Sequence, residues 1–429
     1  MAEDASRLTS LAEQLLGVPL PVRVRAWDGS EAGPPGAPAL VLRNRRALRR
    51  LLFKPGELGL VRAWVSGDLG IDGDLYTALD LMAGLVWERG EDTGRTPLRV
   101  LRDPAARAAV RELLTLAGPP IPPAPPREEV RRSRHLHTRR SDKRAISHHY
   151  DVGNDFYALV LGPSMVYSCA YWEDAGTLES AQRDKLELVC RKLGLTPGQR
   201  LLDVGCGWGS MAIHAAREHG VHVVGVTLSQ EQAAYARKRV ADEGLTDRVE
   251  IRVQDYRDVS DGPYDAISSI GMAEHVGAER YLEYATDLYA LLKPGGRLLN
   301  HQIARRPQRD ETAYHVDEFI DSYVFPDGEL APLGTTVTQL ERAGFEVRDV
   351  ESIREHYART LRRWVTRLEA DWDRAVRLAG PGRARVWRLY MAASALAFEH
   401  NRIGVNQVLA VRTPESGDSG LPLRARTWN

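Results

Sequence analysis

The stretch "RLLDVGCGWGSMAIHAA", residues 200–216, constrains the fold of this chain more than any other. It begins with an apolar run of strand length, continues through glycines in a Gly-x-Gly-x-Gly pattern, and ends in small and apolar residues with helical spacing. Glycine lets the backbone turn tightly and lets a ligand approach the main chain closely. The stretch therefore predicts a buried strand, a tight turn and a helix, which is the repeating unit of parallel α/β sheets.

The same alternation of strand and helix patterns continues between about residues 145 and 412. Helical stretches such as 229–244 separate the strand candidates. Their order predicts an α/β fold with a mostly parallel, seven-stranded sheet. The strand candidates are 200–205, 222–227, 249–254, 264–270, 296–303, 345–350 and 406–411.

A chain of 429 residues is long for a single hydrophobic core, and its pattern divides it. A helical pattern at 6–17 and alternating patterns at 21–29 and 38–44 predict a separate mixed unit at the N-terminus. A Pro-rich stretch is stiff and extended, as a linker is. The predicted division is 1–116 for a small N-terminal α/β domain, 117–144 for a Pro-rich and then Arg-rich linker, 145–412 for the main domain and 413–429 for a flexible tail.

Charge and cysteine content exclude several classes of protein. Lys plus Arg and Asp plus Glu both number 58, so no global field draws the chain to nucleic acid or to a membrane. The three cysteines are too few for a disulfide framework, which favours a reducing cytoplasm, and their spacing predicts no metal site. The N-terminus carries acids where a signal peptide needs positive charge, and no apolar run reaches the roughly 20 residues that span a bilayer.

The residues at the strand ends indicate which ligand the glycine-rich turn binds. A dinucleotide site prefers Gly-x-Gly-x-x-Gly and an acid at the end of the second strand. Here the third glycine comes one residue sooner, and the second strand ends in "VTLSQEQ", with Thr227 and Gln232 as hydrogen-bonding groups. Gln254 and Asp255 follow the third strand. This pattern favours S-adenosylmethionine over a dinucleotide, and the alternative is that the glycines only tighten a turn.

Several motifs in order resemble the cyclopropane fatty acid synthases and the related mycolic acid methyltransferases. They are "HYDVGNDFYALVLGPSMVYSCAYW", "LLDVGCGWG", "GVTLSQEQ", "QDYRD", "GMAEHVG", "LKPGGRLLNHQI" and "FPDGEL". The resemblance is dense over 145–412 and loose in the N-terminal unit. It implies a Rossmann-like class I methyltransferase fold and an enzyme that adds a carbon from S-adenosylmethionine to the cis double bond of an acyl chain.

The resemblance also implies two sets of site residues. The catalytic set surrounds a bound bicarbonate ion and consists of Cys169, Glu274, His301, the backbone of Ile303, and Tyr357. The S-adenosylmethionine set consists of Tyr167, Ser168, Asp203, Gly205, Cys206, Gly207, Gly209, Thr227, Leu228, Gln232, Gln254, Asp255 and Tyr256.

The chemistry suits these residue types. An alkene is a weak nucleophile that must be held in line with the methyl group, and its attack leaves a carbocation that water would quench. Aromatic faces stabilise a cation, and a bicarbonate is a suitable general base for the proton that then leaves. Each residue also has a plainer interpretation: Glu274 as a helix-start charge, His301 as a core histidine, Tyr357 as a packed ring, and Cys169, Cys190 and Cys206 as small buried residues.

Serine stands at 394, where many family members carry a cysteine in a late helix. A serine without a nearby base is a poor nucleophile, so covalent thiol catalysis at that position is excluded for this chain.

Two segments of the sequence bear on how the enzyme reaches its substrate. The segment 360–378 is either a helix that covers an acyl tunnel or an ordinary amphipathic helix. The basic run 131–144 either contacts anionic headgroups or is a solvated linker, and it lacks the aromatic residues typical of nucleic-acid binding. We expect a cytoplasmic enzyme that takes unsaturated phospholipid from the inner face of a membrane, with a homodimer as one option.

The favoured product is a cyclopropane ring. The first alternative is a mid-chain methylene that a separate reductase turns into a methyl branch. Two further alternatives are a small-molecule or protein methyltransferase and a catalytically silent lipid-binding module.

Overall fold

The computed structural model describes residues 3–86, 104–130, 152–173, 176–311, 314, 316–326 and 328–423. Tyr150 and the basic run 131–144 lie outside the described residues. The chain divides into two compact units. The smaller unit contains 1–131, 322–324 and 380–396, and the larger contains 132–321, 325–379 and 397–429. The domain boundaries drawn from the sequence stay predictions.

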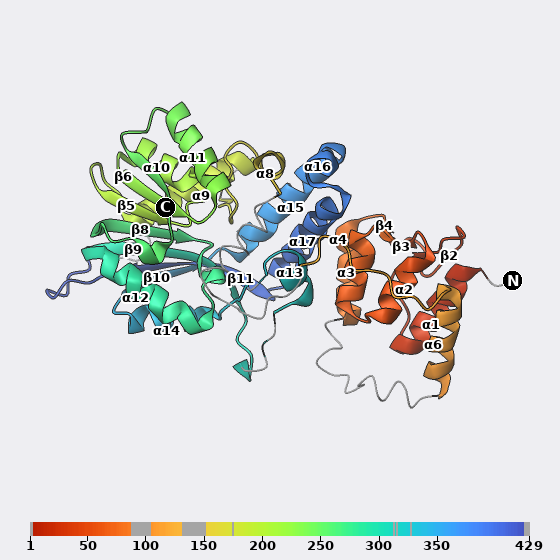
Figure 1. Cartoon of the computed structure of the whole chain (residues 1–429). Coiled ribbons are helices and arrows are strands. Elements are labelled where there is room, and N and C mark those ends of the chain that lie inside the picture. Colours follow the sequence, from red (N-terminus) through yellow and green to blue (C-terminus); the bar gives the residue numbers. More distant parts are fainter. Residues whose placement is uncertain are drawn as a thin grey trace. The chain divides into compact units, whose positions relative to one another are not determined.

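A seven-stranded sheet forms the centre of the larger unit, in the order β10-β11-β9-β8-β5-β6-β7 (Figure 1). Strands β5 to β9 run parallel, and only β11 runs against its neighbours β9 and β10. The predicted α/β fold with a mostly parallel sheet is confirmed. The strands are β5 (Arg200–Val204), β6 (His222–Thr227), β7 (Val249–Val253), β8 (Tyr264–Ile270), β9 (Leu292–Arg305), β10 (Glu346–Ser352) and β11 (Ile403–Val411).

Helices cover both faces of this sheet (Figure 1). Leu201 of β5 packs in one apolar cluster and its neighbour Leu202 in the other, because successive strand side chains point to opposite faces. Burial on both faces explains why the strands read as nearly continuous apolar runs. Helices α9 (Leu178–Leu193), α10 (Ser210–His219) and α11 (Gln230–Asp242) contribute to the first cluster, and α12 (Tyr281–Leu291) and α14 (Leu333–Arg342) to the second.

The parallel strands bring their carboxyl ends to one edge of the sheet. Three short 3-10 turns follow strand ends there: η1 (Tyr256–Asp258), η2 (Ala273–His275) and η3 (Ala278–Arg280). In open α/β sheets this edge is where ligands bind.

The segment 360–378 differs from expectation, because it belongs to two helices. Helix α15 (Arg354–Ala370) ends at Asp371, whose φ of −127° and ψ of 47° leave the helical region, and α16 (Trp372–Ala379) follows. Helix α8 (Asn154–Leu161) packs against both. Two helices have residues in both units: most of α13 (Glu318–Tyr323) belongs to the larger unit, and most of α17 (Pro381–Glu399) belongs to the smaller.

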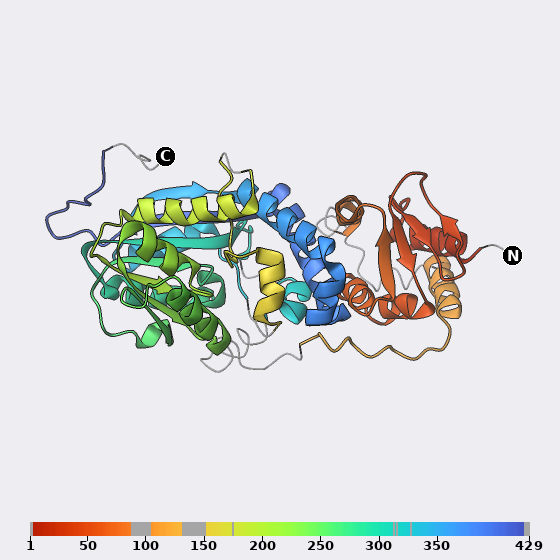
Figure 2. The ribbon, with the colours of Figure 1, turned by 90° about the horizontal axis from the view of Figure 1, so that it is seen from above.

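The smaller unit has a four-stranded sheet in the order β2-β1-β3-β4, accompanied by helices (Figure 2). The Pro-rich stretch belongs to this unit, since Arg50 Nη1 donates to the carbonyl of Ala124 at 2.9 Å and Arg62 pairs with Glu129. No helix in the described ranges is long and apolar enough to cross a bilayer. The N-terminal elements of the smaller unit are α1 (Asp4–Leu16), β1 (Arg23–Arg25), β2 (Glu31–Ala32), β3 (Ala39–Leu42), α2 (Arg45–Phe53), α3 (Glu57–Val65), β4 (Leu69–Asp72), α4 (Leu75–Val86) and α6 (Pro104–Ala117).

Candidate active site

The glycine-rich turn joins β5 to α10 and has a shape that only glycine permits. Gly205 has a φ of 76°, and a Cβ there would lie 2.4 Å from Met272 Cγ. Gly209 has a φ of 80° and packs against Ala236 of α11, whose Cβ would be 3.1 Å away. A Cβ on Gly207 would meet only Gln232 Nε2, at 4.0 Å. The turn is thus fixed by close neighbours at both ends and open in the middle, as a ligand-binding loop requires.

Asp203 is the penultimate residue of β5, just before the turn, and only one oxygen of its carboxylate has a hydrogen-bond donor among the described residues. Ser268 Oγ donates to Oδ1 at 2.8 Å, while Oδ2 is buried and has no hydrogen-bond partner among the described residues. Burial raises the pKa of Asp203 to about 6. A buried acceptor without a donor costs free energy, so a polar ligand group that approaches Oδ2 would be favoured.

Lys185 of α9 is buried beside this carboxylate. Its Nζ donates to Ser168 Oγ at 3.0 Å. Burial lowers the pKa of Lys185 to about 8, against the opposing effects of Cys169 and Asp203. Lys185 was not predicted from the sequence. The signal for it was a lysine in register with the apolar face of its helix, next to Leu186 and one turn before Val189.

The second strand end is organised around Thr227. Thr227 Oγ1 donates to Gln232 Oε1 at 3.0 Å and accepts from the backbone N–H of Ser229 at 3.2 Å. The backbone N–H of Gln254 donates to the carbonyl of Thr227 at 3.1 Å, which joins the second strand end to the third. Leu228, between Thr227 and Ser229, is half-buried. These contacts place the predicted residues of β6 and β7 side by side.

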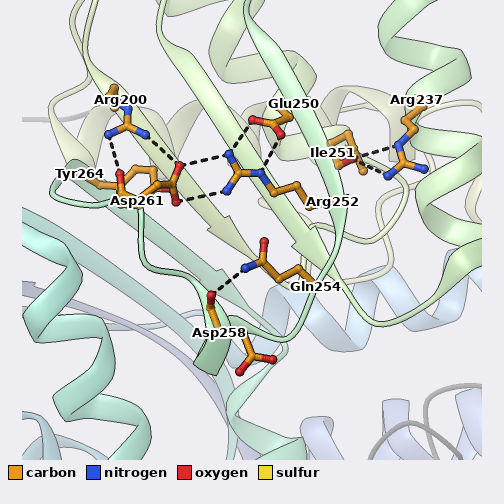
Figure 3. Close-up of polar contacts among 9 residues, drawn as sticks. All are labelled: Arg200, Arg237, Glu250, Ile251, Arg252, Gln254, Asp258, Asp261 and Tyr264. Atoms are coloured by element: carbon orange, nitrogen blue, oxygen red, sulfur yellow. Dashed lines mark hydrogen bonds and ion pairs between the residues drawn. The ribbon is translucent and has the colours of Figure 1, made fainter.

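The residues after β7 are already engaged. Gln254 Nε2 donates to the carbonyl of Asp258 at 2.8 Å (Figure 3). Arg257 holds Asp255 through Nε, at 2.8 Å from Oδ1, and Nη2, at 2.6 Å from Oδ2. Burial raises the pKa of Tyr256 above its usual range. Arg257 was not predicted from the sequence either, and the only signal for it was the nearby acid in "QDYRD".

Figure 3 also shows an ion-pair network that fixes the loop between η1 and β8. Arg252 pairs with Glu250 at 2.6 Å and with Asp261 at 3.1 Å, and Arg200 pairs with Asp261 at 3.2 Å. These groups are partly exposed, so each pair adds little stability, but together they hold the loop that carries Asp261.

A continuous row of aromatic rings runs from the glycine-rich turn to α15. Trp208 and Tyr157 have ring centroids 4.6 Å apart, Tyr157 and Tyr167 5.6 Å, Tyr167 and Trp364 5.4 Å, and Trp364 and Tyr357 6.0 Å. Pairs at these separations are mutually attractive. Two of the aromatic residues at 150–172, Tyr157 and Tyr167, therefore belong to a row of rings that continues into α15. Trp364 was not predicted.

Glu274 lies in η2, just beyond the end of β8, and is the most unusual acid of this edge. Its Oε1 accepts from the backbone N–H of Ile303 at 2.8 Å. Its Oε2 is buried with no hydrogen-bond partner in the described part of the chain. Burial raises the pKa of Glu274 to about 7. A solvated helix-start charge would show neither property.

His301 lies on β9, two residues before Ile303, and is buried. Gln407 of β11 lies directly opposite, with Nε2 3.3 Å from His301 Nδ1. Burial lowers the pKa of His301 well below its usual value, and the nearby charges of Lys185 and Lys192 lower it further. The ring is therefore neutral, and the proton lies on Nε2 when Gln407 Nε2 donates to Nδ1. Gln407 was not predicted, because its partner lies 106 residues away.

Cys169 and Tyr357 complete the predicted catalytic set. The Cys169 thiol is fully buried and donates to the carbonyls of Ala170 at 3.2 Å and Ile353 at 3.6 Å. Burial raises the pKa of Cys169 well above its usual value, so the group is a thiol and a poor nucleophile. Tyr357 is buried against Phe398, with ring centroids 4.8 Å apart.

The chain is similar in sequence to proteins of one family of lipid-modifying enzymes. The family model "Mycolic acid cyclopropane synthetase" matches residues 137–408. The probable fatty acid methyltransferase Rv3720 of Mycobacterium tuberculosis is 46% identical over 94% of this chain and 94% of its own. The cyclopropane-fatty-acyl-phospholipid synthase of Escherichia coli K12 is 42% identical over 63% of this chain and 68% of its own.

A solved structure shows the same likeness in three dimensions. The crystal structure of mycolic acid cyclopropane synthase CmaA1 complexed with SAH and CTAB superposes with a TM-score of 0.59 at 34% identity. It covers 63% of this chain and 98% of that protein.

Proposed function

Because this chain belongs to the mycolic acid cyclopropane synthetase family of S-adenosylmethionine-dependent methyltransferases, we propose that it transfers a one-carbon unit to the cis double bond of an unsaturated phospholipid acyl chain. The proposed product is a cyclopropane fatty acyl chain. The observation that carries the proposal is Glu274, a buried acid with one oxygen held by a backbone amide and the other left without a partner.

S-adenosylmethionine fits the carboxyl edge of the sheet. The open turn at Gly207 and the unsatisfied Oδ2 of Asp203 are the two features that a polar ligand would complete. Gln254 lies beside Thr227 through its backbone N–H, and we propose that Gln254 and Asp255 bind the remainder of such a ligand while Asp258 and Arg257 hold their side chains. When bound there, the sulfonium supplies the electrophilic methyl group.

The residues around Glu274 suit a small oxyanion. His301 offers its Nε2–H, and the Cys169 thiol and the Tyr357 ring would form the walls in the proposed arrangement. Bicarbonate bound there would supply the base that removes a proton from the methylated acyl chain. Glu274 would accept from its hydroxyl, while Ile303, whose N–H already holds Glu274 Oε1, fixes the orientation of that carboxylate. We place Ile303 in this supporting role rather than in direct contact.

The aromatic row would exclude water from the site, as the reaction requires. A carbocation formed on the acyl chain would face rings rather than water, and each aromatic face stabilises a cation by about 0.5–2 kcal/mol. Tyr157, Tyr167 and Trp364 are the rings that connect the glycine-rich turn to α15.

A mid-chain methylene is the alternative product, with a separate reductase as partner. The same cation precedes both outcomes, and the full-length likeness to a protein described as a fatty acid methyltransferase favours keeping this alternative. We further propose that the enzyme works at the membrane surface, through the basic run 131–144. Charge reversal across that run should weaken vesicle binding at low salt, and unchanged binding would leave it a plain linker.

The product is identified by gas chromatography and mass spectrometry of lipids from cells that express this chain, with and without a reductase. A cyclopropane chain that forms irrespective of the reductase supports the proposal. A methylene chain that a reductase converts to a methyl branch would replace it with the alternative, and unmodified lipids would contradict both.

A further inference from the structure

Away from the proposed active site, α9 and α10 face each other with a cluster of side chains typical of metal sites. Cys190 and Glu187 come from α9, and His214 and His219 come from α10. Cys190 Sγ and one nitrogen of each histidine all lie within 4.8 Å of one another. The cluster has no role in the reaction proposed above.

The carboxylate of Glu187 completes the cluster. Its Oε2 lies 3.2 Å from His214 Nε2 and 3.0 Å from His219 Nε2, while its Oε1 accepts from Arg191 Nε at 2.9 Å. A tetrahedral zinc site with bonds of about 2.0 Å places its nitrogen and oxygen ligands about 3.3 Å apart. The carboxylate oxygen already has about that spacing from each of the two imidazole nitrogens. A zinc-bound sulfur lies about 3.6 Å from such nitrogens, so the Cys190 side chain needs to move by about 1 Å at most.

We propose that Glu187, Cys190, His214 and His219 form a binding site for a divalent transition metal, with Zn²⁺ as the preferred ion. One thiolate, two imidazoles and one carboxylate are ligands that zinc accepts in tetrahedral sites. Binding forms a metal–sulfur bond and releases the thiol proton to solvent. One thiolate and one carboxylate balance the two positive charges of the ion, so the completed site is neutral, as its burial requires.

The position of the cluster indicates a structural role. Cys190 and His214 are buried, whereas Glu187 is about 30% exposed in its side chain and gives an ion a way in. Helix α10 begins directly after the glycine-rich turn. A metal that joins α9 to α10 would therefore fix the position of the helix that follows the glycine-rich turn.

Cobalt titration of the full chain, stripped of metal with a chelator, tests the site. Co²⁺ alone should bind with one tight equivalent and give the near-ultraviolet charge-transfer band of a cobalt–thiolate bond, and Zn²⁺ should displace it. Cys190→Ser should abolish that band and weaken Co²⁺ binding at least tenfold. His219→Asn, a change at a partly exposed helix end, should weaken binding similarly without threatening the core. His222→Asn is the matched control, because His222 is exposed on the neighbouring β6.

Zn²⁺ should also raise the unfolding temperature of the wild type and leave that of His219→Asn unchanged. A wild-type chain that binds no tight equivalent, or that binds Co²⁺ without the thiolate band, would overturn the proposal and leave a hydrogen-bonded His–Glu–His set. Equal binding by His219→Asn would overturn it too. The probe is the metal alone, so the result is independent of the proposed methyl transfer.

Discussion

Replacing Glu274 by glutamine should make the protein inactive and, at alkaline pH, more stable. Glutamine preserves the shape of the side chain and the acceptor for the Ile303 N–H, which lies 2.8 Å from Oε1. It removes the charge and the capacity to exchange a proton. Losing a carboxylate that takes part in proton transfer lowers kcat by about a hundredfold or more. Affinity for S-adenosylmethionine should change by less than about threefold, because the glycine-rich turn is untouched.

The stability change follows from the pKa of Glu274, which burial raises from 4.5 to about 7. A rise of this size corresponds to about 3 kcal/mol at about 1.36 kcal/mol per unit. The unfolded chain ionises at the lower pKa and the folded chain at the higher one, so wild-type stability falls as pH rises from about 4.5 to 7. Glutamine does not ionise, so the variant loses no stability at this position over the same pH range. The difference in unfolding free energy between Glu274→Gln and the wild type should therefore grow by about 3 kcal/mol in favour of the variant over that range.

Urea denaturation at a series of pH values measures this difference, in buffer free of carbon dioxide, alongside turnover with monounsaturated phospholipid. Glu283→Gln makes the same change at an exposed acid of α12 and should alter neither activity nor the pH dependence. Full activity of Glu274→Gln would show that the catalytic pocket is misplaced. A stability difference that does not vary with pH would show that Glu274 is not the isolated buried acid described above.

Three other variants probe the neighbouring groups. Gly205→Ala should weaken S-adenosylmethionine binding at least tenfold by calorimetry, because its Cβ would lie 2.4 Å from Met272 Cγ; unchanged affinity would mean that the turn yields freely. Cys169→Ser should reduce turnover by less than about tenfold, since the thiol only donates to carbonyls, whereas complete loss would indicate a nucleophile. Lys185→Met should weaken cofactor binding by removing the donor to Ser168. The wild type should also gain stability relative to this variant as pH rises above 8, because burial lowers the pKa of Lys185 to about 8 and the lysine loses its charge first in the folded state. A difference in urea midpoint between wild type and variant that is the same at pH 8 and pH 10 would refute this.

Much of the fold could be predicted because its signals are local. Strands such as β5, β6 and β8 are short, largely apolar runs between helical patterns, and the glycine pattern at 205–209 has few structural uses. The break at Asp371 was not predictable in this way, because the helical pattern of 360–378 continues through it and tertiary packing decides where the helix ends.

The sequence predicts which residues lie at this edge of the sheet, but not which side chains contact them. Strand ends place Thr227, Gln254 and Glu274 at one edge, since parallel strands end together. Gln407 reaches His301 through strand pairing across the sheet, which no local pattern encodes. The metal cluster is equally non-local, because Cys190 and His214 meet only when α9 and α10 pack together.

Methyl transfer to an acyl double bond is the central claim, and one measurement tests it directly. The purified chain is incubated with methyl-labelled S-adenosylmethionine and vesicles of monounsaturated phospholipid, beside vesicles of the saturated counterpart, and the acyl chains are analysed by mass spectrometry. We predict a gain of one labelled CH2 unit on the unsaturated chains alone, with loss of the double bond or its migration to a methylene. No gain on any unsaturated lipid, or label in the headgroup, would contradict the account.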